Sequence, residues 1–174
     1  ANKRRTEMSS MSIDYALHQG VYGYRDSLRE ELKAVKDSGV GTIKLFTTYK
    51  NVGYMVEKRE ELKEIFSICK DLNLMVSVHA EDDAIISEID KEWTGSYEPK
   101  DHADLRPAKA EAEAVKYIAE IALELDMPIY LVHLSSREGL EAVREMRDKG
   151  VKIIVETTPT YLFLERSKLV IEDG

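Results

Sequence analysis

Cysteine, proline and long apolar runs are scarce in this sequence. Its 174 residues include one cysteine and four prolines. A single cysteine, Cys69, excludes an intramolecular disulfide, and its apolar neighbours indicate a buried side chain on a helix in a reducing compartment. No apolar run approaches the roughly 18 residues of a membrane span, and the first residues show no signal-peptide pattern. We therefore expect a cytoplasmic protein with no membrane partner.

Basic charge is also in short supply, since 25 lysines and arginines face 33 aspartates and glutamates and the net charge is -8. The two signs are interleaved along the chain, which is typical of a solvated surface. There is no basic stripe for nucleic acid and no polybasic segment for lipid headgroups. The composition favours a small molecule or another protein as the ligand. The hydrophobic content of 43% is enough for the core of one domain.

Apolar residues recur at three- and four-residue steps in four segments, which predicts amphipathic helices at residues 28–35, 62–69, 112–125 and 140–146. Gly39, Asn73, Gly150 and residues 126–128 predict helix ends. After each end comes a short, mostly apolar and β-branched run, at residues 42–47, 74–78, 129–132 and 151–155. Such runs are typical of parallel strands buried on both faces. A further strand is predicted near residues 13–17.

Predicted strands and helices alternate along the chain, which indicates a βα architecture of the α/β class. About five βα units fit into the sequence, whereas a complete eight-fold barrel takes about 250 residues. We expect residues 1–174 to form part of a (β/α)8 barrel of the TIM type, without the flanking barrel strands or any small β domain. A small doubly wound sheet is the alternative that periodicity does not exclude. Residues 82–107 break the pattern and predict a long, substrate-handling βα loop that holds a short helix.

Two predicted strands end in histidine, at His79 and His133. The carboxyl ends of parallel strands converge on the active site in βα folds, so two imidazoles there could bind one metal ion. The alternative is that each is a hydrogen-bonded residue at the rim of the core. His18 also ends an apolar run, and we expect a structural or supporting role for it. His102 lies in the long loop, where we expect it to pair with neighbouring aspartates or face solvent.

Lys44 lies inside a strand that is predicted to be buried on both faces. A buried ammonium is costly unless it is paired or neutral. A lysine that extends its head group to solvent is one explanation. The other is a neutral amine that has reacted with carbon dioxide, because the resulting carbamate could bridge two metal ions. Zinc suits imidazole and carboxylate-like ligands, so Lys44, His79 and His133 form a coherent partial ligand set.

Tyr49 and several carboxylates could support such a site. Tyr49 follows the strand of Lys44, so its hydroxyl could donate to a developing oxyanion, and a surface-loop tyrosine is the alternative. Glu81 and Glu156 follow predicted strands and could orient imidazoles. Two further carboxylates, Glu111 and Glu113, lie on a predicted helix and are expected to be solvated or to cap it.

Six segments, in this order, resemble the hydantoinase and dihydropyrimidinase branch of the cyclic amidohydrolases. They cover nearly the whole chain from about Ser12 onward, and the ordered set is more specific than any one of them. The segments are residues 14–18 (DYALH), 43–50 (IKLFTTYK), 78–81 (VHAE), 102–114 (HADLRPAKAEAEA), 132–136 (VHLSS) and 156–162 (ETTPTYL).

The resemblance implies a metal-dependent hydrolase that opens cyclic ureides or imides such as hydantoin and dihydropyrimidines. It implies that carboxylated Lys44 bridges two zinc ions, that His79 and His133 bind the second zinc, and that Tyr49 holds the substrate and its oxyanion. Tyr49 favours this branch over allantoinases and dihydroorotases, which are the enzymatic alternative. The family usually has cysteine where Thr158 stands, and no ligand depends on that position.

Two parts of the family's site have no counterpart in this sequence, namely the His-x-His pair of the first strand and the late-strand aspartate that activates water. We expect both in parts of the parent protein outside this chain. The chain alone is then expected to be inactive, to bind zinc weakly or not at all, and to form a homo-oligomer or a complex. The alternative function is a non-catalytic scaffold like the neuronal collapsin-response proteins, which have lost metal ligands that stand here. A small βα protein with inert histidines would not explain the ordered motifs.

Overall fold

The sheet contains five parallel strands that are paired in chain order. The computed structural model describes residues 2–169. Its strands are β1 (His18–Gly20), β2 (Thr42–Phe46), β3 (Met75–His79), β4 (Ile129–Leu131) and β5 (Ile153–Val155). A doubly wound sheet reverses its strand order at a switch point, and the described strands do not reverse. The winding is therefore that of a barrel segment, which confirms the predicted fold class.

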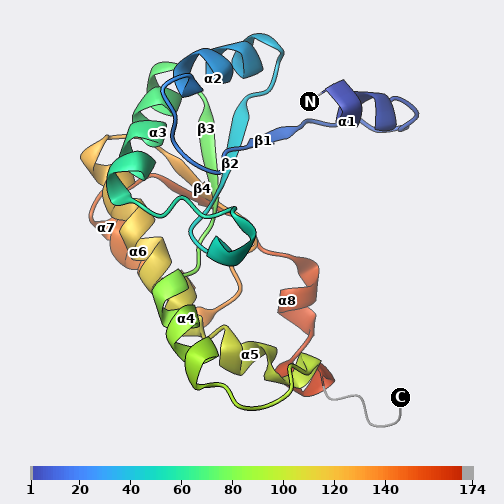
Figure 1. Ribbon diagram of the computed structural model, residues 1–174, viewed down its shortest axis with the longest axis vertical. Helices are drawn as coiled ribbons and strands as arrows, with labels where there is room; N and C mark the ends of the chain where they lie inside the picture. Colours follow the sequence, from blue (N-terminus) through green and yellow to red (C-terminus); the bar gives the residue numbers. More distant parts are fainter. Residues whose placement is uncertain (1, 170–174) are drawn as a thin grey trace.

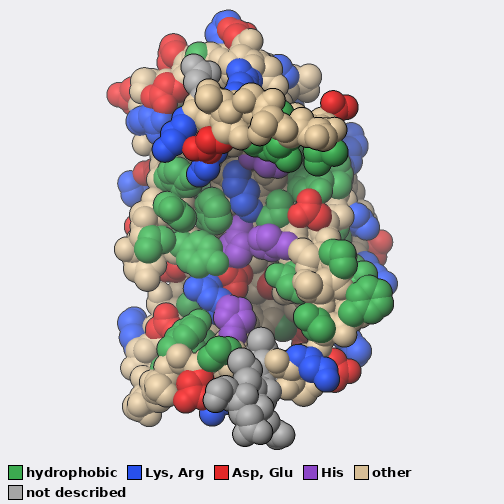
Figure 2. All heavy atoms as spheres, turned by 90° about the vertical axis from the view of Figure 1, so that its right-hand side faces the viewer, with side chains coloured by type: hydrophobic (Ala, Val, Ile, Leu, Met, Phe, Trp, Pro, Cys, Tyr) green, Lys and Arg blue, Asp and Glu red, His purple; other side chains and the backbone are tan. Residues whose placement is uncertain are grey.

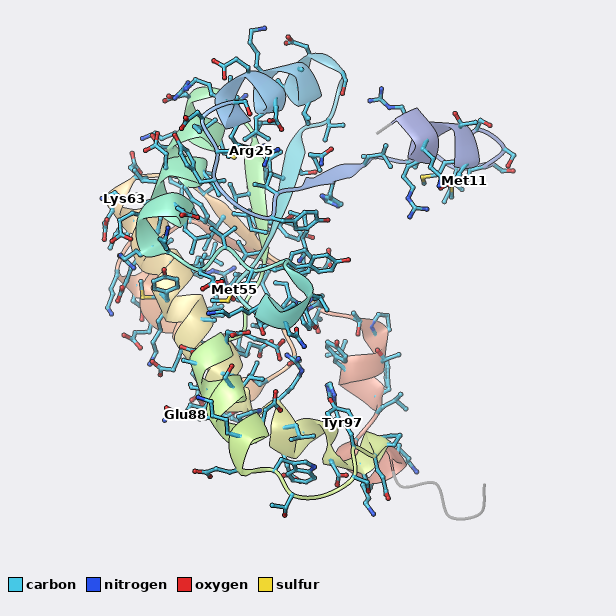
Figure 3. All side chains as sticks on the ribbon, viewed as in Figure 1. Met11, Arg25, Met55, Lys63, Glu88 and Tyr97 are labelled. Carbon is cyan, nitrogen blue, oxygen red and sulfur yellow. The ribbon has the colours of Figure 1, made fainter. Side chains whose placement is uncertain are left out.

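Helices follow the strands and cover one face of the sheet (Figure 1). The four predicted helices are confirmed as α2 (Leu28–Asp37), α3 (Arg59–Asp71), α6 (Ala108–Glu124) and α7 (Arg137–Asp148). Lys63 and Glu88 lie on the outer side of this helical layer, pointing away from the strands (Figure 3). The remaining elements are α1 (Asn2–Glu7), α4 (Asp83–Glu92), α5 (His102–Leu105), α8 (Pro159–Phe163) and the 3-10 turns η1 (Lys50–Val52), η2 (Pro99–Asp101) and η3 (Arg166–Leu169).

The predicted helix ends coincide with left-handed backbone. Gly39 and Gly150 have φ angles of 87° and 98°, and Asn73 and Asp126 have φ angles of 52° and 44°. Glycine adopts this conformation without a Cβ penalty, and asparagine and aspartate tolerate it better than most residues. The chain thus leaves α2, α3, α6 and α7 at the residues that the sequence indicated.

The core lies between the helices and one face of the sheet. In β2, Ile43 and Leu45 are fully buried, whereas Thr42, Lys44 and Phe46 alternate with them and are only partly buried. The expectation of strands buried on both faces is therefore wrong for β2. The physical reason is that helices cover one face only, so the side chains of the opposite face line an open hollow.

Two sequence predictions need correction. Residues 13–17 form no strand, and β1 begins only at His18, because Ile13 is 69% exposed and has no layer to pack against. The long loop holds more helix than predicted, since α4 spans ten residues. Its start is fixed by the Asp82 side chain, which accepts hydrogen bonds from the backbone N–H groups of Ala84 and Ile85. None of the helices in the described part of the chain has the length and apolarity that a membrane crossing requires.

Candidate functional site

The polar residues singled out in the sequence gather at the carboxyl edge of the sheet. His79 is the last residue of β3, and its Cα is paired with that of Phe46 at the end of β2. Glu156 follows directly after β5, and His133 lies two residues after the end of β4. Figure 2 views the side opposite to α2, α3, α6 and α7 and shows histidine side chains in its central hollow, with hydrophobic groups around them. The prediction that these strand ends share one edge is confirmed.

The two strand-end imidazoles are in direct contact. Nδ1 of His79 lies 3.0 Å from Nε2 of His133, and the ring centroids are 4.8 Å apart. His133 has a φ of 42°, which is uncommon for a residue with a Cβ and persists only where the surroundings hold it. The next residue, Leu134, donates its N–H to the carbonyl of Glu156 at 2.7 Å. The turn after β4 therefore presents its histidine to the end of β3.

A carboxylate fixes the other side of the His79 ring. Nε2 of His79 lies 2.7 Å from Oε2 of Glu81, and the same oxygen accepts a 2.8 Å bond from Nη1 of Arg106. Burial opposes ionisation of Glu81, but the hydrogen bond from His79 and the charge of Arg106 hold the pKa of Glu81 below its usual value. A carboxylate at Nε2 favours the tautomer with its proton there and leaves the Nδ1 lone pair directed at His133.

Lys44 extends into the same hollow without a partner. Its Nζ is buried, has no hydrogen-bond partner and lies 4.8 Å from the centroid of the Phe46 ring. Burial lowers the pKa of Lys44 to about 8, against the opposing charge of Glu156. The pKa of His133 is also lowered, first by burial and then by the nearby charges of His79 and Lys44. The amine therefore does not extend to solvent, and it lies within electrostatic range of His133.

Tyr49 stands beside the histidines and not on a free surface. It adopts a left-handed backbone with a φ of 68°, and its ring centroid is 5.1 Å from that of His79. The guanidinium of Arg106 lies 5.0 Å from the centroid of the Tyr49 ring. Burial, followed by the charge of Glu81, raises the pKa of the Tyr49 hydroxyl. The hydroxyl is thus kept protonated and able to donate.

Tyr49, His79, Glu81, Arg106 and His133 line a cavity of about 670 Å³, a volume typical of a small-molecule site. The imidazoles of His79 and His133 meet in its lining, and the unpartnered amine of Lys44 lies within electrostatic range of His133 but is not part of that lining. Within residues 2–169, no three His, Cys, Asp or Glu side chains are gathered so that they could hold a metal ion. The polar and aromatic residues of the lining are Phe46, Tyr49, His79, Glu81, His102, Arg106, Glu111, His133, Ser135, Ser136 and Tyr161.

The other candidates fall outside the histidine pair. His18 begins β1, at the opposite end of the strands, and its Nδ1 lies 2.7 Å from Oγ1 of Thr42, which agrees with a structural role. His102 is exposed on α5 at the edge of the cavity. Glu156 accepts a 2.6 Å hydrogen bond from Tyr130. The expectation that Glu156 orients an imidazole is therefore not met in the described structure.

Two supporting residues were missed or undervalued in the sequence. Arg106 was given no role, although it contacts both Glu81 and Tyr49. Glu111 was expected to be solvated or to cap its own helix, whereas it accepts from the backbone and hydroxyl groups of Ser135 and Ser136 after β4. The only signal for either residue was its place in the ordered segment of residues 102–114.

A parallel sheet wound in chain order, with its polar site at the carboxyl strand ends, defines the barrel-type βα class of enzyme fold. No protein-family model matches the chain. Rat dihydropyrimidinase is 34% identical over 140 residues, which is 79% of this chain and 27% of that protein. Human dihydropyrimidinase-related protein 5 is 32% identical over 154 residues, which is 87% of this chain and 27% of that protein.

A solved structure agrees with the sequence relatives. The D-hydantoinase of Bacillus sp. AR9 superposes with a TM-score of 0.88 at 29% identity, over 99% of this chain and 39% of that one. The chain therefore belongs to the hydantoinase and dihydropyrimidinase branch of the cyclic amidohydrolases. It spans about a third of the length of the relatives it matches.

Proposed function

We propose that this chain supplies part of the metal centre of a zinc-dependent hydrolase that opens cyclic amides of the hydantoin and dihydropyrimidine type. The observation that carries the proposal is the contact between His79 and His133 beside a buried amine without a partner. Nδ1 and Nε2 of the two rings are 3.0 Å apart, and Nζ of Lys44 makes no hydrogen bond. Two imidazole nitrogens that converge in a cavity suit a zinc ion.

Lys44, His79 and His133 are the residues that would hold metal. Carboxylation of Lys44 would convert an unpartnered amine into an anionic bridging ligand, and the reaction requires the neutral amine. A pKa of about 8 makes that form accessible near neutral pH. Zinc, when bound, supplies a Lewis acid that polarises a carbonyl and makes water more acidic. The lining of the cavity would hold a cyclic ureide or imide, with the Tyr49 hydroxyl donating to the developing oxyanion.

The chain supplies only a partial ligand set under this proposal. Its four histidines are His18, His79, His102 and His133, and they form no His-x-His pair. The remaining ligands and the aspartate that activates water would come from a parent protein in which residues 1–174 are part of a (β/α)8 barrel. The chain alone would then be inactive, and its zinc site would be partial.

A second candidate is a non-catalytic scaffold with the same fold. Similarity to human dihydropyrimidinase-related protein 5, at 32% identity, is close to the similarity to rat dihydropyrimidinase, at 34%. The enzyme hypothesis and the scaffold hypothesis differ in what they require of the cavity. An enzyme needs the donor atoms of Lys44, His79 and His133, whereas a scaffold does not.

The deciding experiment uses the parent protein that contains this chain. Zinc content and ring opening of hydantoin and dihydrouracil are measured for the wild type, His79→Ala and His102→Ala. We expect about two zinc ions and turnover in the wild type, loss of both in His79→Ala, and little change in His102→Ala. His102 is the matched control because it is exposed at the edge of the same cavity. A wild type without zinc and without ring opening would favour the scaffold.

A further inference from the structure

We propose that Arg106 and Glu111 are positioning residues that together hold the two histidines in their mutual orientation. Arg106 lies just before α6 and Glu111 lies in its first turn. Neither side chain is hydrogen-bonded to the facing pair of ring nitrogens. Each instead fixes the segment from which one histidine projects, so that the start of a single helix determines the geometry of both strand ends.

Arg106 acts on His79 through Glu81. Its Nη1 donates to Oε2 of Glu81 at 2.8 Å, and that oxygen lies 2.7 Å from Nε2 of His79. The guanidinium also lies 5.0 Å from the centroid of the Tyr49 ring, which limits its own freedom. The backbone supports the same connection, since the N–H of Asp82 donates to the carbonyl of Ala110 at 2.9 Å. The loop after β3 is thus tied twice to the start of α6.

Glu111 acts on His133 through the loop that follows it. One carboxylate oxygen accepts from N and Oγ of Ser135 at 2.9 and 3.0 Å, and the other accepts from N of Ser136 at 2.8 Å and from its hydroxyl. All of these donors lie two or three positions after His133. Gly139 in the first turn of α7 leaves the room that this carboxylate needs, because a Cβ there would be 2.5 Å from Oε2 of Glu111. The carboxylate is therefore enclosed as well as hydrogen-bonded.

The strained backbone at His133 explains why the loop after β4 needs the hydrogen bonds to Glu111. A φ of 42° places its backbone in the left-handed region, which a free loop would leave. Orienting groups beyond the ligands commonly change metal affinity by about 10- to 100-fold when they are removed. This inference rests on the proposed function for its purpose, because fixed imidazoles would hold Nδ1 of His79 and Nε2 of His133 side by side before a metal ion arrives.

The test observes the rings directly in the full 174-residue chain by NMR, without metal. A ring N–H that is bonded to a carboxylate exchanges slowly with water, so the wild type should show a one-bond correlation at Nε2 of His79. It should also show a nuclear Overhauser contact between the two rings. We expect Arg106→Ala to lose the N–H signal, and both Arg106→Ala and Glu111→Gln to lose most of the ring-to-ring contact. Arg106→Lys should restore part of the signal, because it keeps the charge but not the planar fork.

Matched controls separate positioning from general stability. Arg59 pairs with Glu124 at 2.6 Å and lies 5.2 Å from the ring centroid of Tyr117, so it repeats the contacts of Arg106 on the outer helices. Arg59→Ala and Glu124→Gln should lower the unfolding temperature about as much as Arg106→Ala and Glu111→Gln do, and they should leave both ring signals in place. Unchanged ring signals in folded Arg106→Ala and Glu111→Gln would overturn the proposal. If the wild-type chain shows both ring signals but the parent protein takes up no zinc, the proposed metal centre is wrong. The positioning role of Arg106 and Glu111 would still hold in that case.

Discussion

Nδ1 of His79 and Nε2 of His133 face each other across 3.0 Å, although 54 positions separate the two residues in the chain. They meet because β3 and β4 are paired in parallel, with Val78 opposite Leu131, so that both strands end at the same edge. With the His79 proton held at Nε2 by Glu81, the Nδ1 lone pair of His79 is the one that faces His133. This relationship is the basis of the predictions that follow.

The first prediction concerns Lys44 as a ligand in the parent protein. Lys44→Ala should remove most of the bound zinc and lower ring-opening activity at least 100-fold, because the proposal gives the position between the two ions to carboxylated Lys44. A small carboxylic acid added at millimolar concentration should restore part of both by replacing the carbamate. Metal analysis and a hydantoin-opening assay check this, with Lys152→Ala as the control because Lys152 is exposed. Full activity in Lys44→Ala would exclude the role given to this lysine.

The second prediction concerns the stability of the metal-free chain. The pKa of Lys44 is about 8 in the folded chain against an ordinary value of 10.5, so the unfolded chain binds more protons between these two pH values. Wild-type stability should therefore rise with pH across this window, and the full penalty of burying the amine applies below it. Lys44→Met should be more stable by about 1 to 2 kcal/mol at pH 7, a figure reduced for partial solvent screening.

Urea unfolding at several pH values measures this difference. The advantage of Lys44→Met should shrink as the pH rises from 8 to 10.5. A constant difference would mean that the gain comes only from added apolar contact and that the amine carries no penalty.

Much of this arrangement could be predicted from the sequence, because periodicity and helix ends define the βα units and the strand-end residues define the edge. The four long helices and strands β2 to β5 follow from apolar spacing and from Gly39, Asn73 and Gly150. The open face could not be predicted in this way. Alternate residues of β2 are exposed to a hollow only because helices cover one side, and a single strand carries no information on that covering layer.

The contacts of Arg106 and Glu111 also could not be predicted from local sequence patterns. Arg106 is bonded to Glu81 across 25 positions, and Glu111 is bonded to Ser135 across 24. Such pairs depend on how α6 crosses the strand ends and not on spacing along one element. The strand predicted at residues 13–17 failed for a related reason. Its alternating apolar residues fit a strand pattern, but no layer of the described structure packs against them.

The third prediction concerns Thr47, which joins the ends of β2 and β3. Its buried hydroxyl donates to the carbonyl of Glu81 at 2.8 Å and accepts from the N–H of the same residue at 3.0 Å. Thr47→Val keeps the shape and removes both bonds, so it should destabilise the chain by about 1 to 3 kcal/mol. Thr157→Val is the control, since its hydroxyl bonds one carbonyl at an exposed position. Equal losses in the two variants on urea unfolding would contradict this account.

The fourth prediction concerns Cys69 on α3. Its side chain is fully buried, and burial raises the pKa of the thiol to about 12 from an ordinary value of 9.0. Because the thiolate is the reactive form, alkylation by iodoacetamide at pH 8.5 should be very slow in the folded chain and fast in urea. Mass spectrometry of the alkylated chain over time measures both rates. Similar rates with and without urea would show that α3 opens readily and that the core is looser than described.

The last prediction concerns the isolated chain, which should be catalytically inert and bind zinc weakly or not at all. Under the proposed function Lys44, His79 and His133 would satisfy one metal position in part, and a carbamate that lacks its two metal ions should revert to the amine. The sheet also leaves β1 and β5 with one neighbouring strand each among the described strands, and its open face exposes apolar side chains such as Ile154, at 46%. Unpaired edges and apolar surface favour association, so the chain should form a homo-oligomer or a complex. Metal analysis, a hydantoin-opening assay and a light-scattering mass on one preparation check all three expectations. A monomer with two equivalents of zinc and turnover would mean that this chain holds a complete site, and that the ligands assigned here to the rest of a parent barrel come from its own residues.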